Sequence, residues 1–163
     1  MKRASLLFFC LLSSCAPSSP WQLDAITARD KNFNSARLKY TTPNNSSPLR
    51  FEMTRTADHI ESYLHLVRYS FTPSDGASLV KVLFTLNGEE REEWIPLLEG
   101  AMKLHIPLQM TQEITRALQK GEKVSILVDD FEQTLLPELF SQFYKKLIGP
   151  TIFFQNPIKG PLQ

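Results

Sequence analysis

The side chains in this sequence best suited to bind a metal ion or move a proton are three histidines, His59, His65 and His105. A β-strand over 58–71 would place four polar side chains on one face, because side chains alternate along a strand: His59, Glu61, Tyr63 and His65. At about 3.3 Å per residue, His59 and His65 would be roughly 20 Å apart, whereas zinc–nitrogen bonds are about 2.0–2.1 Å long. A single ion cannot bridge them, so we expect no metal site and a polar sheet face.

A helix beginning at Asp58 is the alternative for this segment, since its apolar residues also have helical spacing. In such a helix Glu61 and His65 would be four residues apart and could share an ion. His105 could join either residue only through a tertiary contact. We favour the strand, because aromatic and β-branched residues are common in the segment.

The acidic residues also fail to form a catalytic set. Asp129 and Asp130, with Glu132 nearby, could suggest paired carboxylates, but adjacent strand residues point to opposite faces. We interpret them as turn or cap residues. The charged run over 89–93 follows a predicted turn and is interpreted as solvated, with docking of a basic partner as the alternative.

Other catalytic motifs are missing from the sequence. No Gly-x-Ser-x-Gly elbow or phosphate-binding glycine loop occurs, and Ser74-Asp75-Gly76 has the composition of a turn. We therefore predict no catalytic, cofactor-binding or metal-binding residues, no cofactor and no enzyme activity. A small hydrolase that uses His59 or His65 with a carboxylate is an alternative hypothesis.

The amino terminus has the composition of a secretory signal peptide. Lys2 and Arg3 precede an apolar segment over 4–12, which small residues follow. This segment of about nine residues is too short to span a bilayer, since a spanning helix needs roughly 20 residues. We expect it to direct export and to take no part in the fold.

The end of this segment, Leu12-Ser13-Ser14-Cys15, resembles the lipobox of bacterial lipoproteins. The resemblance implies cleavage after Ser14 and attachment of fatty acyl chains, palmitate among them, to Cys15. Several chains on one residue give firm membrane anchoring. By analogy with the enterobacterial sorting rule, Ala16 favours the outer membrane, with the protein facing the periplasm or the cell surface.

Composition excludes several other functions. Removal of 1–14 takes away Cys10 with the signal, and lipidation occupies Cys15, so neither a free thiol nor a disulfide is expected. The loss of Lys2 and Arg3 leaves 16 of the 18 basic residues against 17 acidic ones. This balance gives no support for nucleic-acid binding.

Three segments follow from the composition. Residues 1–14 are the cleaved signal peptide, 15–48 are the lipidated cysteine and a Pro-, Ser- and Asn-rich tether, and 49–163 are a single globular domain. Aromatic and aliphatic residues interrupt the polar pattern within 21–40. An alternative interpretation is therefore that part of this stretch docks on the domain or on a partner.

Strand patterns dominate the predicted domain. Alternation predicts strands over 49–55 and 102–106, and apolar runs predict strands over 62–71, 79–86 and 124–128. A turn at 57–58 would pair the strand over 62–71 with the strand over 49–55. Asn87-Gly88 is typical of a type I′ hairpin turn and predicts a return strand through 92–95.

Two helices complete the expected fold. Thr111 is a candidate cap for a helix that ends at Lys120-Gly121. Apolar spacing predicts a second helix within 131–147, with Pro137 in its first turn, and prolines predict an irregular path over 148–163. The fold class is thus β-rich α+β: an antiparallel sandwich or half-barrel of about six strands with one or two helices packed on it.

These observations favour a non-enzymatic envelope lipoprotein. We expect the lipid on Cys15 to attach it to the membrane and its domain to bind an envelope protein partner or assist assembly of an envelope complex. The alternative is a carrier of a lipid or small apolar ligand held between sheet and helix, since 131–147 is rich in Leu and Phe.

Overall fold

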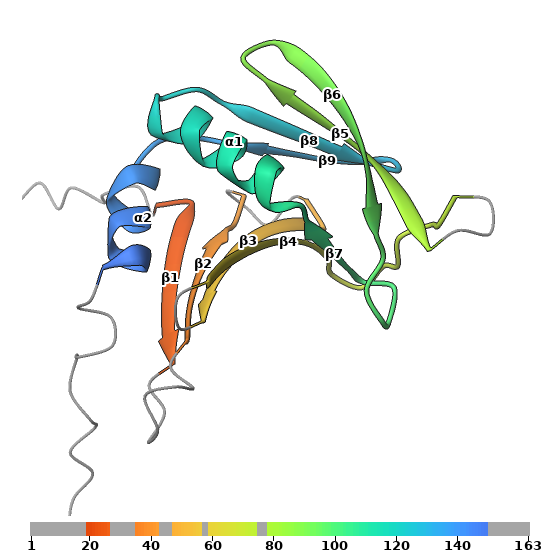
Figure 1. Cartoon of the computed structure of the whole chain (residues 1–163), viewed down its shortest axis with the longest axis horizontal. Coiled ribbons are helices and arrows are strands. Elements are labelled where there is room, and N and C mark those ends of the chain that lie inside the picture. Colours follow the sequence, from red (N-terminus) through yellow and green to blue (C-terminus); the bar gives the residue numbers. More distant parts are fainter. Residues whose placement is uncertain (1–18, 27–34, 43–46, 57–58, 75–77, 150–163) are drawn as a thin grey trace, which may run out of the picture.

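The computed structural model describes residues 19–26, 35–42, 47–56, 59–74 and 78–149 (Figure 1). These residues form nine strands and two helices, arranged as two antiparallel sheets that pack face to face. The predicted fold class, a β-rich α+β sandwich, is confirmed. The predicted signal peptide, Cys15, the expected turn at 57–58, Asp75-Gly76 and the predicted carboxyl-terminal path over 150–163 lie outside the described residues.

The first sheet, sheet A, has the strand order β1-β2-β3-β4-β7. Its strands are β1 (Trp21–Ile26), β2 (Ser35–Tyr40), β3 (Leu49–Thr56), β4 (His59–Leu66) and β7 (Lys103–Ile106). The favoured prediction for the histidine segment, a strand, is confirmed, although β4 ends at Leu66. β4 pairs with β3, as the sequence predicts, and its other edge pairs with β7.

β1 and β2 lie inside the segment predicted as a tether. That prediction is wrong for 21–26 and 35–40, which pair with each other and extend sheet A from β3. Trp21, Leu38 and Tyr40 are buried in the core. The alternative interpretation, docking on the domain, is confirmed for these residues, because burial of large side chains outweighs the polar composition of the flanking chain.

The second sheet, sheet B, has the strand order β6-β5-β8-β9. Its strands are β5 (Leu79–Leu86), β6 (Glu89–Pro96), β8 (Val124–Val128) and β9 (Phe131–Leu135). Asn87 and Gly88 have φ of 58° and 80°, as the predicted type I′ turn requires. Pro96 lies on the edge strand β6, where a missing N–H is tolerated.

The core lies between the two sheets and is completed by helix α1 (Leu108–Gln119). In Figure 1, α1 lies along the opening between the sheets. The prediction of Thr111 as its cap is wrong: the helix begins after Pro107, and Thr111 is buried within it. Its end is as predicted, since Gly121 has φ of 85° and the N–H of Glu122 donates to the carbonyl of Ala117.

The prediction of a single helix within 131–147 is wrong for the first half of this range. Residues 131–135 form β9, and the second helix, α2, covers only Phe140–Ile148. Pro137 therefore precedes the helix, and Ile148 belongs to it rather than to an irregular tail. α2 packs against β1 and β2, where Phe140 meets the ring of Trp21 with centroids 4.8 Å apart. No helix in the described ranges has the length and apolar character needed to cross a membrane.

Candidate functional site

The predicted histidine face exists on the outer side of β4. His59, Glu61, Tyr63 and His65 alternate there with residues of the core. His105 on β7 is opposite Tyr63, and their rings stack with centroids 5.2 Å apart. Among the described residues, no group of three His, Cys, Asp or Glu side chains could hold a metal ion. The face is therefore organised by contacts other than a metal.

Glu52 of β3 is the centre of this outer face, and sequence reasoning missed it. Its residue is only 6% exposed, although it points to the solvent side of sheet A. Its carboxylate pairs with Lys103 and lies 3.9 Å from Arg37. The Lys103 ammonium is 4.7 Å from the centroid of the Tyr63 ring, a cation–π geometry. Positive charges from two other strands, β2 and β7, thus converge on one carboxylate.

The titration of this face favours a structural role. Burial, followed by the hydrogen bond that the Tyr63 hydroxyl donates to Glu61 at 2.5 Å, raises the pKa of Tyr63 to about 12. Burial also lowers the pKa of His65 from 6.5, against the opposing effect of Glu52. At neutral pH both rings are uncharged, and neither is set up as a strong acid or base.

His59 lies apart from this network, at a pocket of 500 Å³ between β4 and α1. Thr111 and Arg116 of α1 also line it, and the described lining includes no carboxylate. The histidine and carboxylate pair that a hydrolase would use is therefore not assembled around His59 in the described lining. His65 has Glu52 near it, but that carboxylate is paired with Lys103.

The acidic residues near β9 have separate roles. Asp129 occupies the β8–β9 turn with φ of 50°, and its carboxylate accepts a hydrogen bond from the N–H of Thr72 at 3.1 Å. It is a turn residue, as predicted. Asp130 and Glu132 instead line a second pocket, which we call the β9 pocket.

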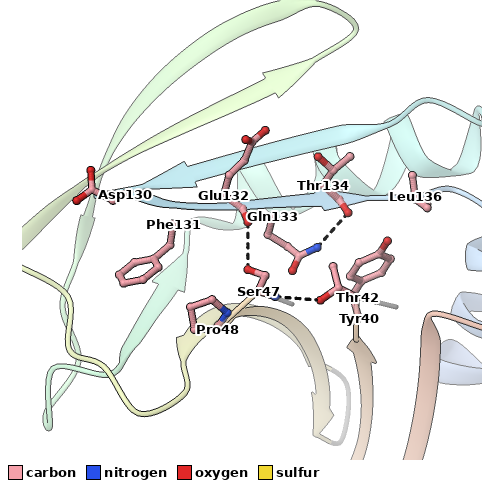
Figure 2. Close-up of a pocket in the computed structure, with 10 residues that line it drawn as sticks. All are labelled: Tyr40, Thr42, Ser47, Pro48, Asp130, Phe131, Glu132, Gln133, Thr134 and Leu136. Atoms are coloured by element: carbon pink, nitrogen blue, oxygen red, sulfur yellow. Dashed lines mark hydrogen bonds between the residues drawn. The ribbon is translucent and has the colours of Figure 1, made fainter. Parts of the chain in front are cut away.

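The β9 pocket has a volume of 490 Å³ and opens beside the edge of sheet B (Figure 2). β9 forms one wall, and the end of β2 with the two residues just before β3 forms the other. The lining residues are Tyr40, Thr42, Ser47, Pro48, Asp130, Phe131, Glu132, Gln133, Thr134 and Leu136. Asp130 and Glu132 are the charged members of this lining, and both are acidic.

The backbone of β9 is open on this side. Val128 pairs with Phe131 across a two-residue turn, so the N–H and C=O groups of Glu132 and Thr134 point away from β8. The carbonyl of Glu132 accepts from the Ser47 hydroxyl, and that of Thr134 accepts from the Gln133 side chain, both at 3.0 Å. Within the described chain, neither of the two N–H groups has a partner.

Gln133 faces the inside of the sandwich and is only 1% exposed. Its Nε2 donates to the Thr134 carbonyl, which fixes the orientation of the amide because a carbonyl can only accept. Its Oε1 then lies in the β9 pocket without a partner among the described residues (Figure 2). A buried acceptor left without a donor costs about 1–3 kcal/mol, so this atom is suited to meet a ligand donor.

The outer face of sheet B exposes large apolar side chains among charged ones, which the sequence analysis did not predict. Trp94 of β6 is 48% exposed and Leu127 of β8 is 39% exposed. The register places Leu83 of β5 directly opposite Leu127 of β8. On the other side of Leu83, Trp94 of β6 is its diagonal neighbour. Leu79, two residues before Lys81, extends the surface. We call Leu79, Leu83, Trp94 and Leu127 the apolar face.

Comparison of the chain with protein-family models, curated proteins and solved structures gave no match. The fold and its surfaces therefore carry the functional argument.

Proposed function

We propose that this protein is a non-enzymatic envelope lipoprotein that is anchored by lipid on Cys15 and binds a protein partner. The observation that carries the partner is the apolar face, with Trp94 and Leu127 both partly exposed. Contiguous apolar surface on a folded domain is typical of an interaction site, and tryptophan is enriched among the residues that dominate binding energy. The location in the outer membrane rests on the resemblance to the lipobox and on Ala16.

Charged side chains are interleaved with the apolar face. Lys81 lies directly opposite Trp94, Glu92 lies directly opposite Leu83, and these two charges pair with each other at 2.6 Å. Specific contacts between proteins combine apolar side chains with hydrogen-bonded polar ones. Complex assembly is therefore a better use of this surface than catalysis.

The length of chain before β1 limits where the partner can lie. Cys15 precedes Trp21, the first residue of β1, by six positions, which reach at most roughly 20 Å when fully extended. A domain held by lipid on Cys15 would stay near the membrane surface. Its partner would be an integral membrane protein or another protein held at the same surface.

The two alternatives have less support. An apolar ligand in the β9 pocket would leave the buried Oε1 of Gln133 without a donor. A hydrolase would need a free carboxylate beside His59 or His65, and Glu52, which acts on His65, is paired with Lys103.

Cross-linking tests the partner in bacteria that express the full chain. A photoreactive residue is placed at position 127 or 83, on the apolar face, and at position 108 as a control. Leu108 begins α1 and is more exposed than Leu127, but it lies outside the apolar face. We expect one recurrent protein adduct from 127 and 83 and none from 108. Repeated absence of an adduct at both positions would contradict the proposal.

The anchor is tested independently by Cys15→Ser. We expect the chain with Cys15 to stay in the membrane fraction and to be released by detergent, because several acyl chains hold it firmly. The variant should keep its signal peptide, because cleavage follows lipidation in this class of protein, and mass spectrometry of the intact chain would detect the difference in mass. A variant that matures to the same mass and still sediments with membranes would refute lipid anchoring.

A further inference from the structure

We infer that the β9 pocket binds an extended polypeptide segment that carries a basic residue and pairs with the open edge of β9. This inference rests on the proposed function, since the segment would belong to the protein partner. It concerns a different surface, because the apolar face lies on the outer side of sheet B and the pocket lies at its edge.

The open N–H groups specify an extended peptide. Glu132 and Thr134 are two residues apart on one strand, so their N–H groups are separated by roughly 7 Å. The carbonyls along one side of an extended chain repeat at the same distance. A strand added to β9 would therefore offer one acceptor to each donor, which is the pattern of β-strand addition.

The buried amide of Gln133 adds a requirement for a donor. Its free Oε1 points into the same pocket and can accept from a backbone N–H or a side-chain ammonium of the segment. Phe131, Pro48 and Leu136 provide apolar contacts beside it. The site thus combines two donors, one acceptor and apolar walls along a single strand edge.

The charge of the lining selects a basic segment. Asp130 and Glu132 are acidic, and the described lining holds no Lys, Arg or His. Figure 2 shows the carboxylate of Glu132 on the outer side of sheet B, away from Gln133 and Ser47. A Lys or Arg of the added strand beside Glu132 on that side would form an opposite-charge cross-strand pair, whereas an acidic residue there would be repelled. The edge of β9 therefore favours a cationic peptide over an acidic one.

The carbonyls of β9 limit which chains can add to this edge. Ser47 and Gln133 already occupy the two outward carbonyls, so an added strand gains hydrogen bonds mainly through its own acceptors. Occupied edge groups reduce indiscriminate strand pairing. The N–H groups, the Gln133 acceptor and the acidic lining together then provide selectivity.

The test uses the full chain, purified in detergent, and fluorescence anisotropy with three labelled decapeptides. The first alternates Lys and Val, the second alternates Glu and Val, and the third replaces two Val of the first with Pro. We expect the Lys peptide to bind, the Glu peptide to bind at least ~10-fold more weakly, and the Pro peptide to lose most of its affinity because it cannot remain a regular strand.

Two variants assign the binding to β9. Thr134→Pro removes one outward N–H and the hydroxyl that bonds Ser125, and it leaves the backbone pairing with β8 intact, because the N–H of Thr134 does not face β8. Gln133→Leu removes the acceptor at similar volume, and Gln112→Leu, on α1, is the matched control. We expect each β9 variant to weaken the Lys peptide ~10-fold and Gln112→Leu to leave its affinity unchanged. Equal melting temperatures would show that all the variants fold. If Thr134→Pro fails to fold, Gln133→Leu still decides the test.

The results separate this inference from the proposed function. Absence of Lys-peptide binding, or binding that both β9 variants leave unchanged, would overturn the inference even if position 127 cross-links a partner. A dimer that forms through β9, with no peptide binding, would overturn it in favour of self-association. Peptide binding that depends on Gln133 would support it even if cross-linking at 127 failed and the apolar face lost its role.

Discussion

The outer faces of the two sheets are built by the same alternation but differ in how their side chains are satisfied. On sheet A, Arg37 and Lys103 converge on the buried carboxylate of Glu52. On sheet B, Leu83, Leu127 and Trp94 are left at the surface. A face whose charges are paired within the domain has little to gain from a partner, whereas an apolar face gains when it is covered. This difference is the reason for placing the proposed partner on sheet B rather than on sheet A.

The largest expected effect compares two tryptophans, one from each sheet. Trp21 is 1% exposed, packs on Tyr40 with ring centroids 4.8 Å apart, and donates from Nε1 to the Leu136 carbonyl at 2.9 Å. We expect Trp21→Ala to lower the free energy of unfolding by about 3–5 kcal/mol. Trp94→Ala should change it by no more than about 0.5 kcal/mol, because surface substitutions cost little.

Urea denaturation of the full chain in detergent, followed by fluorescence of the remaining tryptophan, measures both values. A loss below about 1 kcal/mol for Trp21→Ala would mean that β1 contributes little to the core and that the tether interpretation was correct after all. A large loss for Trp94→Ala would mean that the apolar face stabilises the domain rather than serving a partner.

A second, smaller effect compares one ion pair from each sheet. We expect Glu52→Gln to cost about 1 kcal/mol, because it breaks two pairs around a buried carboxylate while Arg37 and Lys103 keep partial access to water. Glu92→Gln on sheet B should cost less than about 0.5 kcal/mol, since Lys81 and Glu92 are both well exposed. Denaturation at low and high salt measures both, and salt should reduce the Glu92 contribution more strongly. Equal losses in the two variants would remove the contrast between the faces.

Local patterns made several elements predictable from the sequence. Asn87-Gly88 determined the β5–β6 hairpin through its own backbone preferences, and period-two alternation placed the polar residues of β4 on one face. In β2 the same signal was present, because Ala36, Leu38 and Tyr40 alternate toward the core. The polar chain on either side of it concealed this pattern.

Tertiary requirements explain what the sequence did not predict. Gln133 occupies a core-facing position of β9 between Phe131 and Leu135, so a polar residue interrupts the alternation that would have identified the strand. The Glu52 network depends on the register of four strands, which no local pattern specifies. The open edge of β9 follows only from the strand order of sheet B.

The smallest expected effect is a pH dependence that belongs to sheet A. All three histidines of the sequence lie on β4 and β7, and none lies on sheet B. Burial lowers the pKa of His65 from 6.5, while Glu52 acts to raise it and Lys103, Arg50 and Arg37 act to lower it. The unfolded chain therefore binds a proton near pH 6.5, whereas the folded chain binds it only at lower pH. Stability should be unaffected well above pH 6.5 and should fall as the pH decreases toward the folded pKa of His65.

Melting temperatures of the unmodified chain, His65→Gln and His59→Gln between about pH 7.5 and pH 5 measure this effect. The unmodified chain and His59→Gln, which keeps His65, should both lose stability over this range, and His65→Gln should lose less, because it lacks the imidazole that takes up a proton on unfolding. The gap between His65→Gln and the unmodified chain should therefore open below pH 6.5 and widen with acidity. The same comparison can be made between Glu52→Gln and the double variant Glu52→Gln/His65→Gln. Their difference in melting temperature should begin at the same pH and grow larger, because removal of the Glu52 carboxylate takes away the influence that raises the pKa of His65. Curves for His65→Gln and the unmodified chain that stay parallel down to pH 5 would show that the outer face of sheet A is as insensitive to protons as that of sheet B.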